Sequence, residues 1–236
     1  MLLDVRNLNA GYGFLQVLWD VSLTVAEREY VCLVGPNGAG KRTTLKTIAG
    51  LVAPKRGEIL FRGEPIGGLP GNWVCRRGIS YISEDLNLFT RMTVLENLAM
   101  GAYMVNHRKE QQGRLAFVFE LFPRLKERRN QLAGTMSGGE RKMLAVARGM
   151  MSSPDLLLVD EPSLGLAPQV TRGVFKALDV LHKERGLTIL LVEQNVTKTL
   201  QVTDRGYVIE KGKIVLEGKS SDLAENEHVR KVFLGI

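Results

Sequence analysis

The chain has 236 residues, 44% of them hydrophobic and 24% charged, and its 32 basic and 25 acidic side chains give a net charge of +7. This composition is typical of a globular protein and excludes a disordered or fibrous chain. The length predicts one domain of the larger α/β kind, with room for an inserted lobe. Having only two cysteines, Cys32 and Cys75, argues against a disulfide framework and a zinc site.

The N-terminus and the apolar runs predict a soluble protein. Met1-Leu2-Leu3-Asp4 carries an acid early and no basic region, so we expect no signal peptide. No apolar run approaches the roughly 18 residues that a transmembrane helix needs. Basic residues crowd at 76–77, 108–109 and 124–129. We interpret them as a solvated surface, with attraction to anionic lipid or to nucleic acid as the alternatives.

The pattern in the first third of the chain predicts several strands and one helix. A Gly-rich loop separates a short apolar strand from this helix, and Gly50 is a natural stop for it. Alternating or continuous apolar residues predict strands over 2–8, 17–25, 31–34, 59–61 and 79–82, a turn at 11–13, and a helix over 41–49.

The middle third changes character after about residue 90. From 94 to 132 apolar residues recur at helical spacing, as at Leu115, Val118, Phe119 and Phe122, and Pro123 ends one helix. We interpret the stretch of about 90–151 as a helical lobe inserted into the domain.

Signals of a parallel sheet return in the last third. The continuous apolar run 156–159 is typical of a strand covered on both faces. A helix over 168–185, a second buried strand over 188–192, a hairpin at 210–213 and a short terminal helix follow. The order predicts an α/β fold.

The first chemical motif follows the strand 31–34 and opens the helix at 41. In this setting glycines let backbone N–H groups surround an anion, and the helix N-terminus adds its partial positive charge. Lys41 would reach the β- and γ-phosphates. The motif comprises Gly35, Pro36, Asn37, Gly38, Ala39, Gly40 and Lys41.

The second motif is the acidic pair Asp160 and Glu161 after the apolar run. Parallel strands deliver such residues to the carboxyl edge of the sheet, where α/β proteins bind ligands. Asp160 would hold magnesium, directly or through water, and Glu161 would polarise the attacking water.

The third motif is Ser137, Gly138 and Gly139, before an apolar-periodic stretch and shortly before the acidic pair. With the other two motifs it makes the chain resemble the ATP-binding cassette (ABC) family over essentially its whole length. The resemblance implies a P-loop NTPase with a mixed central sheet, an N-terminal antiparallel β subdomain and the helical lobe, all in one nucleotide-binding domain spanning 1–236.

The resemblance also assigns roles to single residues. It implies that Tyr12 stacks on adenine, that Thr43 and Thr44 contact the nucleotide, and that Gln194 lies near the γ-phosphate. Glu84 and Asp160 would surround magnesium. In the family two such subunits meet head to tail, so that Ser137 to Gly139 of one cover the nucleotide of the other, and the loop 163–166 lies at that contact. ATP and Mg²⁺ are the implied cofactors.

Two local strings narrow the resemblance to the subgroup that powers uptake of branched-chain amino acids. Glu84 stands where most members carry glutamine, and Gln194 where most carry histidine. This subgroup implies a second ATPase subunit (the same chain or a related one), membrane-spanning subunits and an extracytoplasmic solute-binding protein. The chain would sit peripherally on the cytoplasmic face of the cell membrane.

One position departs from the family pattern. Arg42 follows Lys41 where a serine or threonine hydroxyl should coordinate magnesium, and Thr43 points about 100° away around the helix. Three hypotheses follow. Arg42 swings away and hydrolysis is slow, or Arg42 occupies the metal position and pairs with Glu84, or the substitution has no designed role.

Two functions therefore compete with an ordinary transporter ATPase. Arg42 favours a module that binds ATP and hydrolyses it poorly. The basic surface raises a DNA-associated ATPase, but such relatives carry a long coiled coil that this chain lacks, so no nucleic-acid partner is expected.

Overall fold

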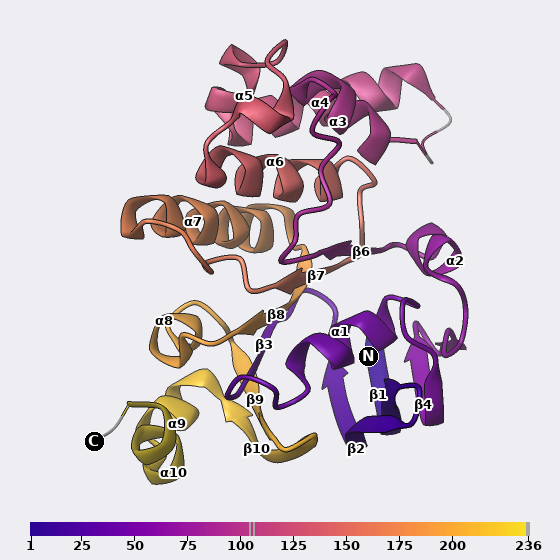
Figure 1. Cartoon of the computed structure of the whole chain (residues 1–236), viewed down its shortest axis with the longest axis vertical. Helices are drawn as coiled ribbons and strands as arrows, with labels where there is room; N and C mark the ends of the chain where they lie inside the picture. The colour runs from indigo at the N-terminus through magenta and orange to yellow at the C-terminus, as the bar shows by residue number, and fades with distance from the viewer. Residues whose placement is uncertain (104, 106, 235–236) are drawn as a thin grey trace.

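The computed structural model describes residues 1–103, 105 and 107–234. Its described part forms two sheets and a stack of helices (Figure 1). The helical stack lies at one end of the molecule, and the N-terminal sheet and the C-terminal hairpin lie toward the other. None of the described helices combines the length and the apolar character that crossing a membrane requires.

The N-terminal sheet is antiparallel, in the order β2-β1-β4-β5. Leu3, Val5 and Leu8 of its central strand are buried, which explains the apolar pattern in the sequence. The turn that joins the first two strands lies at Gly13 and Phe14, slightly later than the expected 11–13. The strands are β1 (Leu3–Tyr12), β2 (Leu15–Val25), β4 (Pro54–Phe61) and β5 (Glu64–Pro65).

The central sheet has the order β10-β9-β3-β8-β7-β6. Neighbouring strands from β9 to β6 are parallel, whereas β10 pairs antiparallel with β9, so the sheet is mixed as expected. Every residue of β3, β7 and β8 is buried, in keeping with their continuous apolar sequence. The strands are β3 (Tyr30–Val34), β6 (Ile79–Ile82), β7 (Leu156–Asp160), β8 (Thr188–Glu193), β9 (Arg205–Glu210) and β10 (Lys213–Lys219).

Helix α1 (Lys41–Ile48) fills the space between the two sheets. Its Leu45 and Ile48 share one apolar cluster with Val5 of β1 and Leu33 of β3, so α1 is fixed on both sides. This packing matters for function because α1 begins at the phosphate loop. The short helices outside the lobe are α2 (Gly71–Arg76), α8 (Val196–Leu200), α9 (Ser220–Glu225), α10 (Glu227–Val229) and the π-helical turn Arg230–Leu234.

The helical lobe stacks on α7 (Pro168–Arg185), as Figure 1 shows. One apolar cluster joins Leu98, Val118 and Leu144 of the lobe to Leu178 of α7 and to the sheet residue Leu157, so the lobe and the sheet share a core. The α/β fold with a mixed central sheet and an N-terminal antiparallel sheet is confirmed, and a separate helical subdomain over about 90–151 stays a prediction. The lobe comprises α3 (Val94–Gly101), α4 (Arg108–Leu121), α5 (Pro123–Glu127), the 3₁₀ turn Ala133–Thr135 and α6 (Gly138–Met150).

Candidate functional site

The phosphate loop connects β3 to α1 in a conformation that needs glycine at two positions. Gly40 has φ +107°, and a Cβ there would lie 2.7 Å from Leu18 Cδ2. A Cβ on Gly35 would lie 2.2 Å from the carbonyl oxygen of Ile209. At Gly35 and Gly40 the loop therefore passes too close to its neighbours for a side chain, and only glycine fits these two positions.

Lys41 begins α1 and its side chain is buried. Nζ donates to the carbonyl oxygens of Gly35 (2.8 Å) and Pro36 (3.1 Å) and lies 3.8 Å from Glu161 Oε1. Burial lowers the pKa of Lys41, although the charges of Glu161 and Asp160 oppose that shift. The ammonium group thus lies inside the loop that it would help to fill with phosphate.

Asp160 ends β7 and is fully buried. Its Oδ2 accepts hydrogen bonds from Tyr81 Oη (2.9 Å) and from Arg42 Nε (3.0 Å). Arg42 also contacts Glu84 through Nη2. The two expected metal ligands, Asp160 and Glu84, are therefore brought together, and the guanidinium of Arg42 lies between them.

Glu161 follows β7 with an unusual backbone, because its φ is +45°. Gln194 Nε2 donates to Glu161 Oε2 at 2.6 Å, so the two residues expected to act near the γ-phosphate are in direct contact. The main chain is fixed as well: Glu161 N donates to Val192 O (2.9 Å), and Lys142 Nζ donates to Glu161 O (3.0 Å). Backbone strain of this kind persists only where the surroundings hold it, and it concentrates at functional sites.

Three residues that support the candidate site escaped the sequence analysis. Tyr81 hydrogen-bonds Asp160, buried Lys142 supports Glu161, and buried Glu193 accepts from the backbone N–H groups of Ser163 (2.8 Å) and Gln194 (3.1 Å). Glu193 ends the otherwise apolar strand β8, and a charged residue there is the signal that could have found it, whereas Lys142 follows the charged Glu140 and Arg141 and gives no such signal.

A cleft of about 480 Å³ collects most of the predicted site residues. Thr44 is not among them, because it is fully buried and its hydroxyl donates to Gly40 O at 3.0 Å. Ser137, Gly138 and Gly139 do not line the cleft either. The cleft is lined by Tyr12, Leu15, Val17, Asn37, Gly38, Ala39, Gly40, Lys41, Arg42, Thr43, Glu84, Glu161, Leu164 and Gln194.

Ser137 instead caps the N-terminus of α6. Its Oγ accepts from Glu140 N (3.3 Å), and Glu140 Oε2 accepts from Ser137 N (3.0 Å) and Oγ (2.9 Å). Ser137 and Gly138 are exposed. This helix N-terminus faces solvent, where a second molecule can reach it.

Comparison with known proteins identifies the family. The sequence model described as "ABC transporter" matches residues 18–164, which include the phosphate loop, the Ser137 motif and the acidic pair. The chain belongs to the ABC transporter family. It is an ATP-binding subunit, and the family's ATP-binding cassettes are ATPases coupled to transport.

Several relatives match this ABC subunit along its whole length. It is 45% identical over 99% of its length to all of the high-affinity branched-chain amino acid transport ATP-binding protein BraG of Pseudomonas aeruginosa. It is 37% identical to the probable branched-chain amino acid transport ATP-binding protein LivF of Archaeoglobus fulgidus, over 100% of this chain and 99% of LivF. It is also 37% identical to the lipopolysaccharide export system ATP-binding protein LptB of Haemophilus influenzae, over 99% of this chain and 97% of LptB.

Solved ABC cassettes share its structure. The ADP conformation of the cassette MJ1267 superposes with a TM-score of 0.86 at 25% identity, covering 100% of this chain and 99% of that one. An ATP-binding subunit of another ABC transporter gives 0.85 at 29% identity, covering 100% and 97%.

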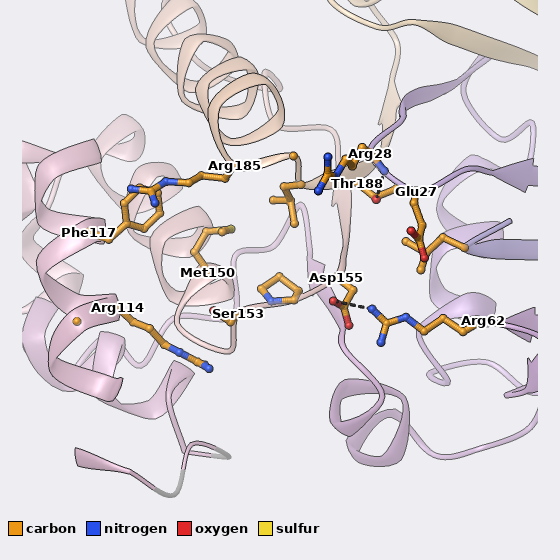
Figure 2. A pocket seen from close by; sticks show the side chains of 15 residues that line it. Glu27, Arg28, Arg62, Arg114, Phe117, Met150, Ser153, Asp155, Arg185 and Thr188 are labelled. Atoms are coloured by element: carbon orange, nitrogen blue, oxygen red, sulfur yellow. Dashed lines mark hydrogen bonds and ion pairs between the residues drawn. The ribbon is translucent and has the colours of Figure 1, made fainter. Parts of the chain in front are cut away.

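A second hollow of this ABC subunit, about 460 Å³, lies where β7 and β8 begin, at the sheet edge opposite the phosphate loop (Figure 2). Most of the arginines that line this hollow already contact neighbouring groups. Arg62 pairs with Asp155 at 2.8 Å, Arg114 donates to Met151 O at 2.9 Å, and Arg185 lies over the ring of Phe117. This arrangement ties α4 and the N-terminal sheet to the loop before β7.

Proposed function

We propose that this chain binds ATP in the phosphate-loop cleft and powers the uptake of branched-chain amino acids. The observation that supports the substrate class is the 45% identity to BraG over the whole chain, against 37% to the LptB of H. influenzae. Glu84 and Gln194, the two positions at which this subgroup departs from most ABC proteins, both line the cleft.

We expect the residues that line the cleft to have different roles in binding and hydrolysing ATP. The loop backbone and Lys41 hold the phosphates, and exposed Tyr12 offers its ring to the adenine. Glu161 accepts a proton from the attacking water, while Gln194, 2.6 Å from its carboxylate, holds that carboxylate in position. A second ATPase subunit, identical or related, supplies Ser137 and Gly139 from the N-terminus of its own α6 and closes the site.

A test of the substrate class is complementation in two hosts. Expressed in P. aeruginosa cells that lack BraG, the chain is expected to restore uptake of radiolabelled leucine, whereas its Glu161→Gln variant is not. Expressed in H. influenzae cells depleted of LptB, it is expected to leave lipopolysaccharide export unrestored. Rescue of export without rescue of leucine uptake would replace this proposal with lipopolysaccharide transport.

Membrane-spanning subunits are the partners that an ABC ATPase of this kind serves, with an extracytoplasmic solute-binding protein on the far side of the membrane. The surface that suits a membrane-spanning partner is a groove of about 420 Å³ between the end of β6 and α3. Phe89, Met100 and Tyr103 line it, and 44%, 41% and 77% of their respective surfaces are exposed. Exposed apolar side chains gathered in one groove are typical of a protein interface. Docking there places the chain peripherally on the cytoplasmic face.

Tyr103→Glu is expected to abolish co-purification with the membrane-spanning subunits, because it introduces a charge into an apolar contact. Binding of ATP by the isolated variant should stay at the native level, since Tyr103 does not line the nucleotide cleft. The exposed Val215→Glu on β10 serves as a control. Equal co-purification of all three proteins would show that the groove is not the docking surface.

A further inference from the structure

Arg42 connects two carboxylates that lie at or just beyond the ends of the neighbouring strands β7 and β6. Nε lies 3.0 Å from Asp160 Oδ2 at the end of β7, and Nη2 contacts Glu84 Oε2, two residues beyond β6. The side chain of Asp160 is fully buried, and 24% of the Glu84 side chain is exposed. A buried carboxylate requires a cation or hydrogen-bond donors, and the guanidinium supplies both.

The residues around this point do not fit a resident magnesium ion while Arg42 is in place. Mg²⁺ requires near-octahedral oxygen ligands at about 2.0–2.1 Å. Asp160 and Glu84 offer such oxygens, and Asp160 Oδ1 is buried without a hydrogen-bond partner among the described residues. Position 42, however, presents N–H donors and a positive charge where the family has a hydroxyl oxygen. Across 1–103, 105 and 107–234, no group of three or more His, Cys, Asp or Glu side chains gathers to hold a metal.

The other neighbours do not supply the missing oxygen. Tyr81 Oη already donates to Asp160 Oδ2, on the same atom that Arg42 contacts. The Thr44 hydroxyl is committed to Gly40 O. A dication entering between the two carboxylates would therefore meet the guanidinium, which competes with it by charge and by volume.

We propose that the Arg42 guanidinium takes the place of the divalent cation in this site, so that ATP binds without Mg²⁺. The guanidinium keeps Asp160 and Glu84 together and leaves one fixed positive charge beside the phosphate loop. The inference deepens the proposed function and rests on it, because it requires ATP to occupy the phosphate-loop cleft.

The test compares ATP affinity in excess EDTA with ATP affinity in excess Mg²⁺, measured by calorimetry on the full chain and on Arg42→Ser. For the native chain the two dissociation constants are expected to agree within about threefold, that is, within roughly 0.7 kcal/mol. For Arg42→Ser, which regains a hydroxyl and loses the guanidinium, removing Mg²⁺ should weaken binding by at least about tenfold. Arg185→Ser, at the opposite edge of the sheet, is the matched control and should respond as the native chain does.

Arg42→Ala separates the loss of the guanidinium from the gain of a hydroxyl, because it removes the guanidinium without adding a hydroxyl. It is expected to regain a dependence on Mg²⁺ smaller than that of Arg42→Ser but larger than that of the native chain. A native chain that needs Mg²⁺ as strongly as Arg42→Ser does would overturn the inference and leave the nucleotide site standing. A native chain that binds no ATP in either buffer would overturn both the inference and the proposed function.

Discussion

Glu161 is the residue on which hydrolysis is expected to depend most. Its carboxylate contacts Gln194 and lies near Lys41, and its backbone is fixed by Val192 and Lys142. These contacts hold the side chain in one orientation toward the cleft. A general base held in this way contributes about 10²–10⁴-fold to a rate.

We accordingly predict that Glu161→Gln lowers phosphate release by at least about 100-fold, because the amide cannot accept the proton of water. The change keeps size and shape, so ATP affinity should stay within a few fold of native. Both quantities are best measured in the native chain and in the Arg42→Ser background. Unchanged release in both backgrounds would remove Glu161 from the mechanism.

At the scale of elements, the phosphate loop offers a matched pair of glycines. Gly38 and Gly40 both have positive φ, +76° and +107°, but a Cβ on Gly38 would meet nothing within 4 Å, whereas one on Gly40 would meet Leu18. Gly38→Ala is expected to destabilise the fold by about 1 kcal/mol through backbone strain alone. Gly40→Ala adds a steric conflict and is expected to cost about 2–4 kcal/mol.

Urea unfolding followed by circular dichroism measures both changes. ATP binding should be lost in Gly40→Ala, since moving Leu18 or α1 reshapes the loop, and only weakened in Gly38→Ala. Equal destabilisation of the two variants would mean that the close approach of Leu18 does not constrain the loop.

The elements that the sequence predicts well are those whose burial leaves a strong pattern. Strand β6 and helix α7 begin and end at the predicted residues, because apolar periodicity and flanking Gly or Pro mark them clearly. Helices α2 and α8 were missed, since six and five residues are too few to show a helical period. In the site, the pairing of Arg42 with Glu84 was one of the hypotheses, but its contact with Asp160 was not. That contact joins residues 118 positions apart, and only the strand order brings them together.

At the scale of the whole molecule, Arg205 links the two sheets and pairs with Glu29 in the loop between β2 and β3. Arg205 at the start of β9 donates to Glu29 Oε1 at 2.7 Å and to Thr24 O of β2, also at 2.7 Å. Burial raises the pKa of Glu29, but the hydrogen bonds from Arg205 and from Ala26 N outweigh it, so the pKa lies below its ordinary value of 4.5.

A lowered carboxyl pKa stabilises the fold above the unfolded value, and that stabilisation is lost as the pH falls through the folded value. We therefore predict that the free energy of unfolding falls on acidification below pH 4.5, and that Glu29→Gln makes this fall shallower. Urea unfolding at a series of pH values measures it. Glu27→Gln is the control, because exposed Glu27 has no ion-pair partner among the residues that the structure describes. If the free energy of unfolding fell equally steeply below pH 4.5 in the native and Glu29→Gln proteins, the prediction would be contradicted.

The position of Lys41 also affects which anions the phosphate loop binds. Its ammonium group donates hydrogen bonds to the carbonyl oxygens of Gly35 and Pro36, so the charge is held close against the loop. An anion that takes this ammonium group as its donor must compete with the two carbonyl oxygens, at a cost of roughly 1–3 kcal/mol. A small monoanion makes too few new contacts to recover that cost, whereas a chain of phosphates recovers it several times over. The loop thus selects polyanions by the number of their charged groups before the rest of the nucleotide is recognised.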